Sequence, residues 1–63
     1  MENTLRIERA RKRISQKELA KEVKVSRQSI YLIENGLMMP KLNMAFRIAH
    51  FFNLKVEELF QTD

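Results

Sequence analysis

The sequence predicts an all-α protein built from five short helices, and three observations support this prediction. Apolar residues recur at intervals of three and four, as at Leu19, Ala20 and Val23. A serine precedes two of the apolar runs, which is the typical place for a helix N-cap. The only glycine and the only proline both fall between predicted helices, so little in the chain interrupts helical structure.

Length and composition limit what else the chain can be. At 63 residues it is predicted to form one domain, residues 1–63, with a compact core. It has no cysteine, which leaves no disulfide framework and no thiolate metal site and fits a reducing compartment. No apolar run approaches the roughly 20 residues of a membrane span, and the charged N-terminus does not resemble a signal peptide. A cytoplasmic protein without membrane contact is therefore expected.

The first helix is predicted over residues 3–13. Leu5, Ala10 and Ile14 are its expected inward positions. Glu8 lies near the same side, where a carboxylate must either stay solvated or find a cation. The positions expected to point outward are all basic: Arg6, Arg11, Lys12 and Arg13.

Capping signals place the next two helices. Ser15 and Glu18 have the spacing of a capping box, which predicts a helix over residues 16–23. Ser26 is a second N-cap candidate, and Gly36 suits the left-handed residue that closes a helix C-terminus. A third helix is therefore predicted between Ser26 and Gly36.

Residues 16–35 read as a helix-turn-helix, because two short amphipathic segments meet there at one polar break. Ala20 falls where the two helices must approach most closely, and a larger side chain would push them apart. The second helix opens with Arg27 and Gln28, and the N-terminal end of such a helix is the part that enters the DNA major groove. The expected contact positions are small or apolar: Leu19, Ala20, Val23, Val25, Ile30 and Ile33.

The C-terminal part is predicted to add two helices. A loop over residues 37–41 leads to a helix over residues 42–52, and a last short helix covers residues 56–60. The loop begins Leu37-Met38-Met39, which is unusually apolar; this segment either folds back onto the core or forms a surface for a partner. The expected inward positions are Leu42, Ala45, Ile48, Ala49, Phe52, Leu54, Val56, Leu59 and Phe60.

The charge is unevenly distributed along the chain. Of the net +4, the whole excess lies in residues 1–31, which hold nine Lys and Arg against four Glu. Residues 32–63 hold three basic and four acidic side chains. A basic half on a small domain suits an anionic partner such as nucleic acid, and it equally suits a solvated surface. Charge alone does not decide between these interpretations.

Several motifs in this order and spacing resemble the Cro/C1-type, or Xre-like, helix-turn-helix family, and the likeness covers nearly the whole chain. It implies a compact five-helix, lambda-repressor-like DNA-binding domain. Such a domain usually acts as a transcriptional regulator on a roughly palindromic operator in double-stranded DNA. The motifs are Ser15-Gln16-x-x-Leu19-Ala20, Val25-Ser26-Arg27-Gln28-Ser29-Ile30, Ile33-Glu34-Asn35-Gly36 and Pro40.

The family's base-reading positions fall on four residues of the third helix. Arg27 offers a two-pronged donor to guanine, and Gln28 can both donate to and accept from adenine. Tyr31 has a hydroxyl that reaches either a base edge or a phosphate. Leu32 either meets a thymine methyl group or packs against its neighbours.

The family's phosphate contacts fall on positions spread over three segments. Gln16 and Ser29 lie at the starts of helices, where the geometry and the dipole attract anions. Asn35 lies at the corner that ends the third helix. Lys17 and Lys41 are the remaining candidates, although surface lysines are common without any ligand.

The resemblance also implies a structural ion pair and two departures from the family pattern. Arg9 and Glu34 match a pair that joins the first and third helices in repressors of this family. Lys24 stands where the family usually has glycine, so either the turn avoids positive φ or the residue bears a strain of roughly 1 kcal/mol. Lys41 replaces the Ser or Thr that commonly caps the fourth helix.

The leading functional prediction is a sequence-specific regulator that binds its operator as a homodimer. One helix-turn-helix unit contacts too few base pairs for genomic specificity, and two linked units multiply their discrimination. Repression is the expected role, although repression and activation differ only in operator position. The expected dimer surface is apolar and C-terminal: Phe51, Leu54, Leu59 and Phe60.

An interaction module, such as an antitoxin or anti-regulator, is the alternative, with residues 37–39 as its surface. Arg27 and Gln28 argue against it, because a fold kept only for protein contact does not need hydrogen-bonding side chains at groove-facing positions. An enzyme is not expected, since one histidine, one glycine and no cysteine provide neither a triad nor a phosphate-binding loop. No cofactor, metal or small-molecule ligand is expected either.

Overall fold

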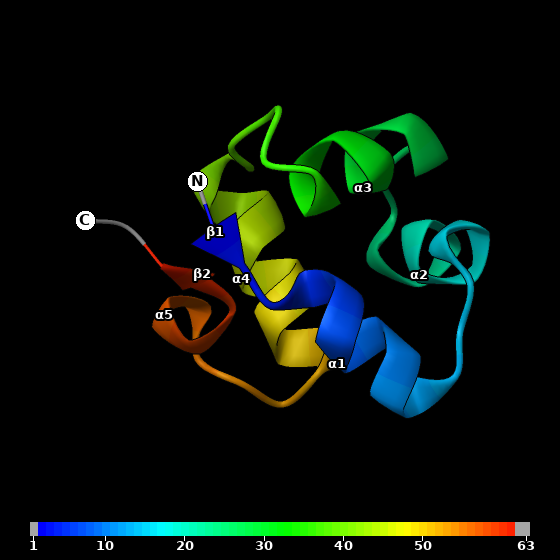
Figure 1. Cartoon of the computed structure of the whole chain (residues 1–63), viewed down its shortest axis with the longest axis horizontal. Coiled ribbons are helices and arrows are strands. Elements are labelled where there is room, and N and C mark those ends of the chain that lie inside the picture. The colour runs from blue at the N-terminus through cyan, green and yellow to red at the C-terminus, as the bar shows by residue number, and fades with distance from the viewer. Residues whose placement is uncertain (1, 62–63) are drawn as a thin grey trace.

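The computed structural model describes residues 2–61, and Met1 and residues 62–63 of the predicted domain lie outside this range. Five helices pack around one apolar core (Figure 1), which confirms the predicted all-α class. Within the described range, no helix is long and apolar enough to cross a membrane. The elements in chain order are β1 (Glu2–Asn3), α1 (Leu5–Lys12), α2 (Gln16–Val23), α3 (Arg27–Glu34), α4 (Leu42–Phe51), α5 (Val56–Leu59) and β2 (Phe60–Gln61).

Every helix contributes at least one fully buried aliphatic side chain to the core. Burying one such side chain stabilises the fold by about 1.5–3 kcal/mol relative to leaving it exposed. The core thus forms where the five helices converge, and it fixes the angle at which α2 and α3 meet. The fully buried side chains are Leu5 of α1, Leu19 of α2, Ile30 and Ile33 of α3, Ile48 of α4 and Leu59 of α5.

The predicted caps of α2 and α3 are formed. Ser15 Oγ accepts a hydrogen bond from the Glu18 amide at 3.0 Å, and the Ser15 amide donates to the Glu18 carboxylate at 3.0 Å. The bonds from Ser15 lower the pKa of Glu18 from its ordinary value. Ser26 Oγ accepts from the Ser29 amide at 3.0 Å. Both helices therefore begin at the predicted residues, and this fixes the short turn between them.

The turns after α1 and α2 place two basic residues in the left-handed region. Arg13 has φ 57° and Lys24 has φ 60°. The turn therefore does not avoid positive φ at Lys24, and the Cβ atom there carries a strain of roughly 1 kcal/mol. After α3, Gly36 takes φ 71°, in agreement with its predicted place at the helix end.

A short antiparallel pairing of β1 with β2, which the sequence did not predict, joins the two ends of the described chain. Asn3 pairs with Phe60 in this register. The Asn3 side chain donates to the Ile33 carbonyl at 2.8 Å and accepts from the Leu5 amide at 3.1 Å. These bonds hold Asn3 outside the helix, so α1 begins at Leu5 rather than at residue 3. At the other end, α5 stops at Leu59 and Phe60 enters β2.

Two predicted inward positions are wrong. Ala10 is exposed, because α1 buries the face that carries Leu5 and Arg9, and Ala10 follows Arg9 on a different side of the helix. Leu42 is 69% exposed. It lies on the flank of α4 that α5, a helix of only four residues, leaves uncovered.

The apolar segment after α3 divides between the two interpretations that the sequence left open. Met38 is half-buried and packs against the core. Leu37 is 70% exposed and Met39 is 64% exposed. Only the middle residue of the segment therefore folds back, and its two neighbours remain on the surface.

Candidate DNA-binding site

The first turn and a half of α3 presents a polar surface to solvent. Arg27 and Gln28 are exposed, and Tyr31 is 49% exposed. Together with Gln16 from the start of α2, these residues line a hollow of about 400 Å³. The hollow thus brings together candidates from both helices of the motif, three for base reading and one for phosphate contact. Leu32, the fourth base-reading candidate, is half-buried and does not line the hollow.

A buried carboxylate orients one of the residues that line the hollow, Gln16. The side chain of Glu34 has no exposed surface, and its Oε2 accepts from Arg9 Nε at 2.7 Å. Its Oε1 accepts from Gln16 Nε2 at 3.0 Å. Arg9 also donates to the Ile14 carbonyl at 2.8 Å. This is the ion pair that the family resemblance implies, and it joins α1 to α3 while orienting the Gln16 amide.

The environment of Glu34 keeps it ionised. Burial on its own would raise the pKa of this carboxyl, but hydrogen bonds from Arg9 and Gln16, together with the positive charges of Arg9 and Arg6, outweigh burial and leave the pKa below its ordinary value. The ionised Glu34 can hold its cation partners in place at neutral pH. Gln16, bound through its NH₂ group, keeps its carbonyl oxygen and its backbone amide for other contacts.

Arg6 is a contributor that sequence reasoning placed only as an outward residue. Its guanidinium lies 3.6 Å from Glu34 Oε1 and donates to Asn35 Oδ1 at 3.2 Å. The Asn35 NH₂ group in turn donates to the Tyr31 carbonyl at 2.8 Å. Because the partners lie 28 and 29 residues away along the chain, no local pattern could have shown this link. Arg6 therefore helps to fix the corner after α3.

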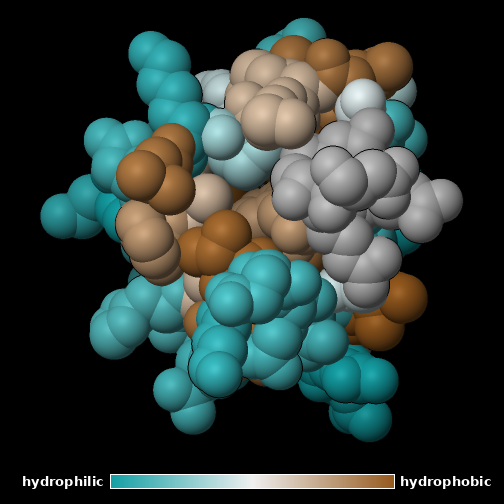
Figure 2. All heavy atoms as spheres, turned by 90° about the vertical axis from the view of Figure 1, so that its left-hand side faces the viewer, coloured by the Kyte–Doolittle hydropathy of each residue, from teal (hydrophilic) through white to brown (hydrophobic). Residues whose placement is uncertain are grey.

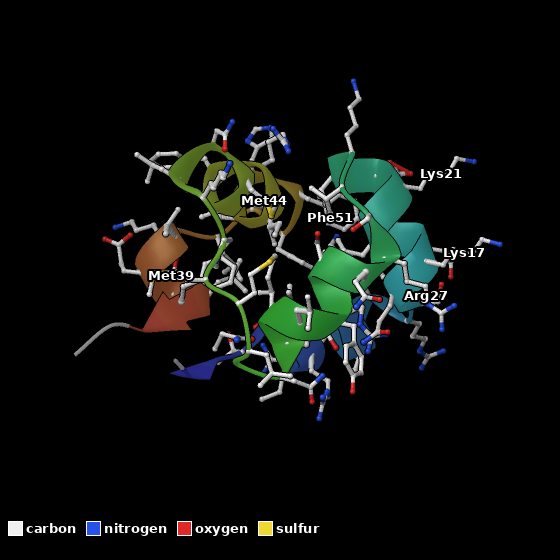
Figure 3. The ribbon with its side chains drawn as sticks, turned by 90° about the horizontal axis from the view of Figure 1, so that it is seen from above. Lys17, Lys21, Arg27, Met39, Met44 and Phe51 are labelled. Carbon is white, nitrogen blue, oxygen red and sulfur yellow. The ribbon has the colours of Figure 1, made fainter. Side chains whose placement is uncertain are left out.

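The remaining candidates for phosphate contact differ in exposure and in whether their side chains already form hydrogen bonds. The Ser29 hydroxyl is 2.9 Å from that of Ser26, so the cap already engages it. Lys17 is exposed on α2 and extends on the same side of the molecule as Arg27 (Figure 3). Lys21 points to that side as well. Lys41 is exposed before α4 and makes no side-chain capping bond.

The four residues predicted as a dimer surface do not form one exposed surface. Leu59 is fully buried and Phe60 is 6% exposed, so both belong to the core of the chain itself. Phe51 is half-buried, with Lys12 Nζ 5.4 Å from its ring centre. Leu54 also packs against the core. The prediction is therefore wrong for Leu59 and Phe60, because so small a core needs these side chains to close it. For the half-buried Phe51 and Leu54 it stays a prediction.

Known proteins are similar to this chain in sequence. A family model described as Helix-turn-helix matches residues 5–59, so the chain belongs to the Cro/C1-type helix-turn-helix family. A protein of Methanocaldococcus jannaschii described as an uncharacterized HTH-type transcriptional regulator is 47% identical over 60 residues, covering 95% of this chain and 91% of that protein. One of Archaeoglobus fulgidus with the same description is 41% identical over 63 residues, covering 100% and 90%.

A third relative extends the comparison to bacteria. A protein of Bacillus subtilis, also described as an uncharacterized HTH-type transcriptional regulator, is 38% identical over 60 residues, covering 95% of this chain and 91% of that protein. Members of this family are DNA-binding transcriptional regulators and are generally not enzymes. The polar surface of α3 is therefore the candidate DNA-binding site of this chain.

Proposed function

We propose that the chain is a sequence-specific repressor that binds a palindromic operator in the cytoplasm as a homodimer. The observation that supports this proposal is the exposed group Arg27, Gln28 and Tyr31 on α3, gathered with Gln16 around one hollow. In this proposal the N-terminal half of α3 enters the major groove, where Arg27 and Gln28 read base edges. Tyr31 contacts a base or a phosphate, and Leu32 meets a thymine methyl group at the edge of the contact.

Phosphate contacts orient α3 in this proposal but carry no sequence information. The start of α2 points its free amides and the Gln16 side chain at one strand, while Lys17 adds a positive charge. Ser29 and Asn35 contact the strand on the other side through α3 and its C-terminal corner. Lys41 reaches the backbone from the loop before α4.

Selection from random duplexes tests the reading of DNA. We expect the purified protein to enrich a palindrome whose half-sites lie about 34 Å apart, one helical turn of DNA. Replacing Gln28 with Ala should weaken binding to that site by about 1–3 kcal/mol and relax the preference at one position of each half-site. The matched control is Arg13→Ala, which removes an exposed side chain in the turn after α1 that does not line the hollow. It should leave the selected sequence unchanged.

The salt dependence separates base contacts from phosphate contacts. We expect Lys17→Ala to weaken binding to the selected and the scrambled duplex equally and to lower the salt slope by about one unit. Equal binding of wild-type protein to both duplexes, lost as salt rises, would contradict sequence-specific reading. That result would instead favour an interaction module that uses the exposed residues Leu37 and Met39.

A further inference from the structure

The exposed surface of α2 separates its charges onto two flanks. Lys17 and Lys21 are four residues apart, and Lys24, the C-cap, follows three residues later, so the three side chains lie on one flank. All three lysines are exposed. Glu18 and Glu22, which are also four residues apart, lie on the adjoining flank. We call Lys17, Lys21 and Lys24 the basic flank of α2.

Two features of the basic flank work against the stability of the motif. Like charges four residues apart repel each other, so Lys17 and Lys21 weaken α2 rather than support it. Lys24 has φ 60°, where its Cβ atom is strained and a glycine would not be. None of the ion pairs that the structure describes between residues 2 and 61 involves these lysines. A bound anion accounts for a positive flank that costs stability and has no acidic partner in this range.

The C-terminal end of the basic flank is held in place from two directions. The Lys24 amide donates to the Ala20 carbonyl, and the Val25 amide donates to the same carbonyl at 3.0 Å. From α4, Arg47 Nε donates to the Val23 carbonyl at 3.0 Å. The backbone on both sides of Lys24 is therefore fixed, so its side chain leaves the turn in a defined direction. Side chains on fixed backbone are what a binding surface requires.

The basic flank lies beside the candidate DNA-binding site and away from the apolar end of the molecule. Figure 3 shows Lys17 and Lys21 extending on the side where Arg27 lies. Along the horizontal long axis of Figure 1, α2 lies at one end and α5 at the other. Figure 2 looks onto the α5 end and shows apolar side chains over its centre and upper left. An anion bound by the basic flank can therefore belong to the same duplex that α3 reads.

The length of the basic flank suits the spacing of phosphates in a duplex. An α-helix rises about 1.5 Å per residue, so the levels of Lys17 and Lys24 differ by about 10 Å. Each strand of DNA carries one phosphate per about 3.4 Å of helix axis, so this length corresponds to about three phosphates. Three lysines thus match a short run of one DNA strand in both length and charge.

We propose that the basic flank of α2 binds phosphates of DNA outside the base pairs that α3 reads. Lys21 and Lys24 join the phosphate candidate Lys17 in this contact. In Figure 1, α2 lies farther toward its end of the molecule than α3 does, so DNA that meets the flank lies beyond the base pairs under α3. The inference rests on the proposed function, because α3 must hold the duplex before α2 meets its flanking part. The contact adds affinity without sequence information, and it makes binding depend on the length of the duplex.

Salt titration with duplexes of two lengths tests the proposal. The short duplex holds one half-site alone, and the long duplex adds one helical turn, about 10 base pairs, on each side. We expect Lys21→Ala/Lys24→Ala to lower the salt slope on the long duplex by about two units, one for each lost phosphate contact. The wild type then loses roughly tenfold more affinity than this variant between about 50 and 200 mM salt. On the short duplex the two proteins should have equal slopes.

A charge-matched variant is the control. Arg13→Ala/Lys55→Ala also removes two exposed positive charges. Figure 1 places the turn after α1 and the loop before α5 at the side of the molecule opposite α3. We expect this variant to keep the wild-type slope on both duplexes. A fall in slope equal to that of Lys21→Ala/Lys24→Ala would mean that net charge sets the salt dependence, and it would overturn the proposal.

Lys24→Gly separates the phosphate contact from the stability of the turn. Glycine relieves the strain at φ 60° and removes the ammonium group. We expect this variant to stay folded by circular dichroism, to bind the long duplex more weakly than the wild type, and to show a salt slope lower by about one unit. A purely structural role of Lys24 predicts binding that is unchanged or tighter, and that result would contradict the proposal.

The same titrations separate this inference from the proposed function. Sequence-specific binding that ignores the length of the duplex, with equal slopes for the wild type and Lys21→Ala/Lys24→Ala, would overturn the inference and leave the reading of DNA intact. The basic flank would then be left to an acidic protein. Absence of any sequence preference, together with a lower slope of the double variant on the long duplex, would contradict the proposed function alone.

Discussion

The surface around α3 and the surface beside α4 and α5 are built from different kinds of side chain. Around α3, a polar network fixes the surface: Glu34 is bound by Arg9 and Gln16, and Arg6 links it to Asn35. Beside α4 and α5, apolar side chains such as Leu42 and Phe46 lie exposed and make no such network. A surface that reads hydrogen-bonding patterns needs side chains in fixed places, whereas a surface that buries apolar area needs only shape.

The largest effect should come from breaking the network at its buried ion pair. We expect Arg9→Ala to cost up to about 3–5 kcal/mol of stability, because the buried Glu34 carboxylate then loses its nearest cation and keeps only Gln16 and the more distant, exposed Arg6. DNA binding should fall with it. Urea unfolding followed by circular dichroism measures the loss. Arg11→Ala is the control, since its pair with Glu8 is a surface contact with Arg11 72% exposed. Wild-type stability in Arg9→Ala would contradict the role of the pair.

The second-largest effect should come from acid, which protonates Glu34 and so weakens the same network. The pKa of Glu34 is lowered in the folded chain, so its contribution to stability is complete above the pKa of an unfolded glutamate, about 4.3. That contribution is lost as the pH falls through the lower folded value. We expect the free energy of unfolding to decline below about pH 4.5 in the wild type and less steeply in Glu34→Gln. An equally steep decline of the free energy of unfolding in both proteins would show that Glu34 does not couple folding to pH.

A smaller gain should come from relieving strain in the turn of the motif. Lys24 has φ 60°, a conformation that glycine adopts without steric cost. We expect Lys24→Gly to raise the stability by up to about 1 kcal/mol, less the entropy that glycine gains in the unfolded chain. Thermal unfolding of the wild type and the variant measures this gain in stability. Lys21→Gly, inside α2, is the opposing control and should destabilise by a similar amount. A loss of stability in Lys24→Gly would show that the side chain makes a contact that outweighs the strain.

The smallest effect on folding should come from the exposed apolar side chains of α4, Leu42 and Phe46. Leu42 is 69% exposed, so Leu42→Ser should change the stability of the single chain by no more than about 0.5 kcal/mol. Thermal unfolding of the wild type and the variant at equal, low protein concentration measures this effect. A cost above 2 kcal/mol would mean that Leu42 belongs to the core after all, and the contrast between the two surfaces would disappear.

Local signals made most of the fold predictable. The capping box at Ser15 and the N-cap at Ser26 placed α2 and α3 at their observed starts, because a cap depends only on residues three positions apart. The positions of Ala10 and Leu42 were wrong, because helical spacing alone does not show how far a neighbouring helix reaches. The pairing of β1 with β2 joins opposite ends of the chain, and no local pattern reports such a contact.

In the candidate site, too, local motifs predicted some residues, whereas contacts between distant parts of the chain were missed. The family motif marked Arg27 and Gln28, and both are exposed where α3 begins. The link from Arg6 to Glu34 and Asn35 was missed, since only the packing of α1 beside α3 brings these residues together. Leu59 and Phe60 were wrongly placed on a C-terminal interface, because composition counts apolar residues without distinguishing buried side chains from exposed ones.

The central claim is that α3 and the start of α2 contact DNA, while the exposed side chains of α4 and α5 do not. Amide chemical shifts of the ¹⁵N-labelled protein, followed during titration with a half-site duplex, test this most directly. We expect the largest changes at Gln16, Arg27, Gln28 and Tyr31, and little change at Phe46 or Glu57. Changes centred on α4 and α5, with the amides of α3 unmoved, would contradict the account.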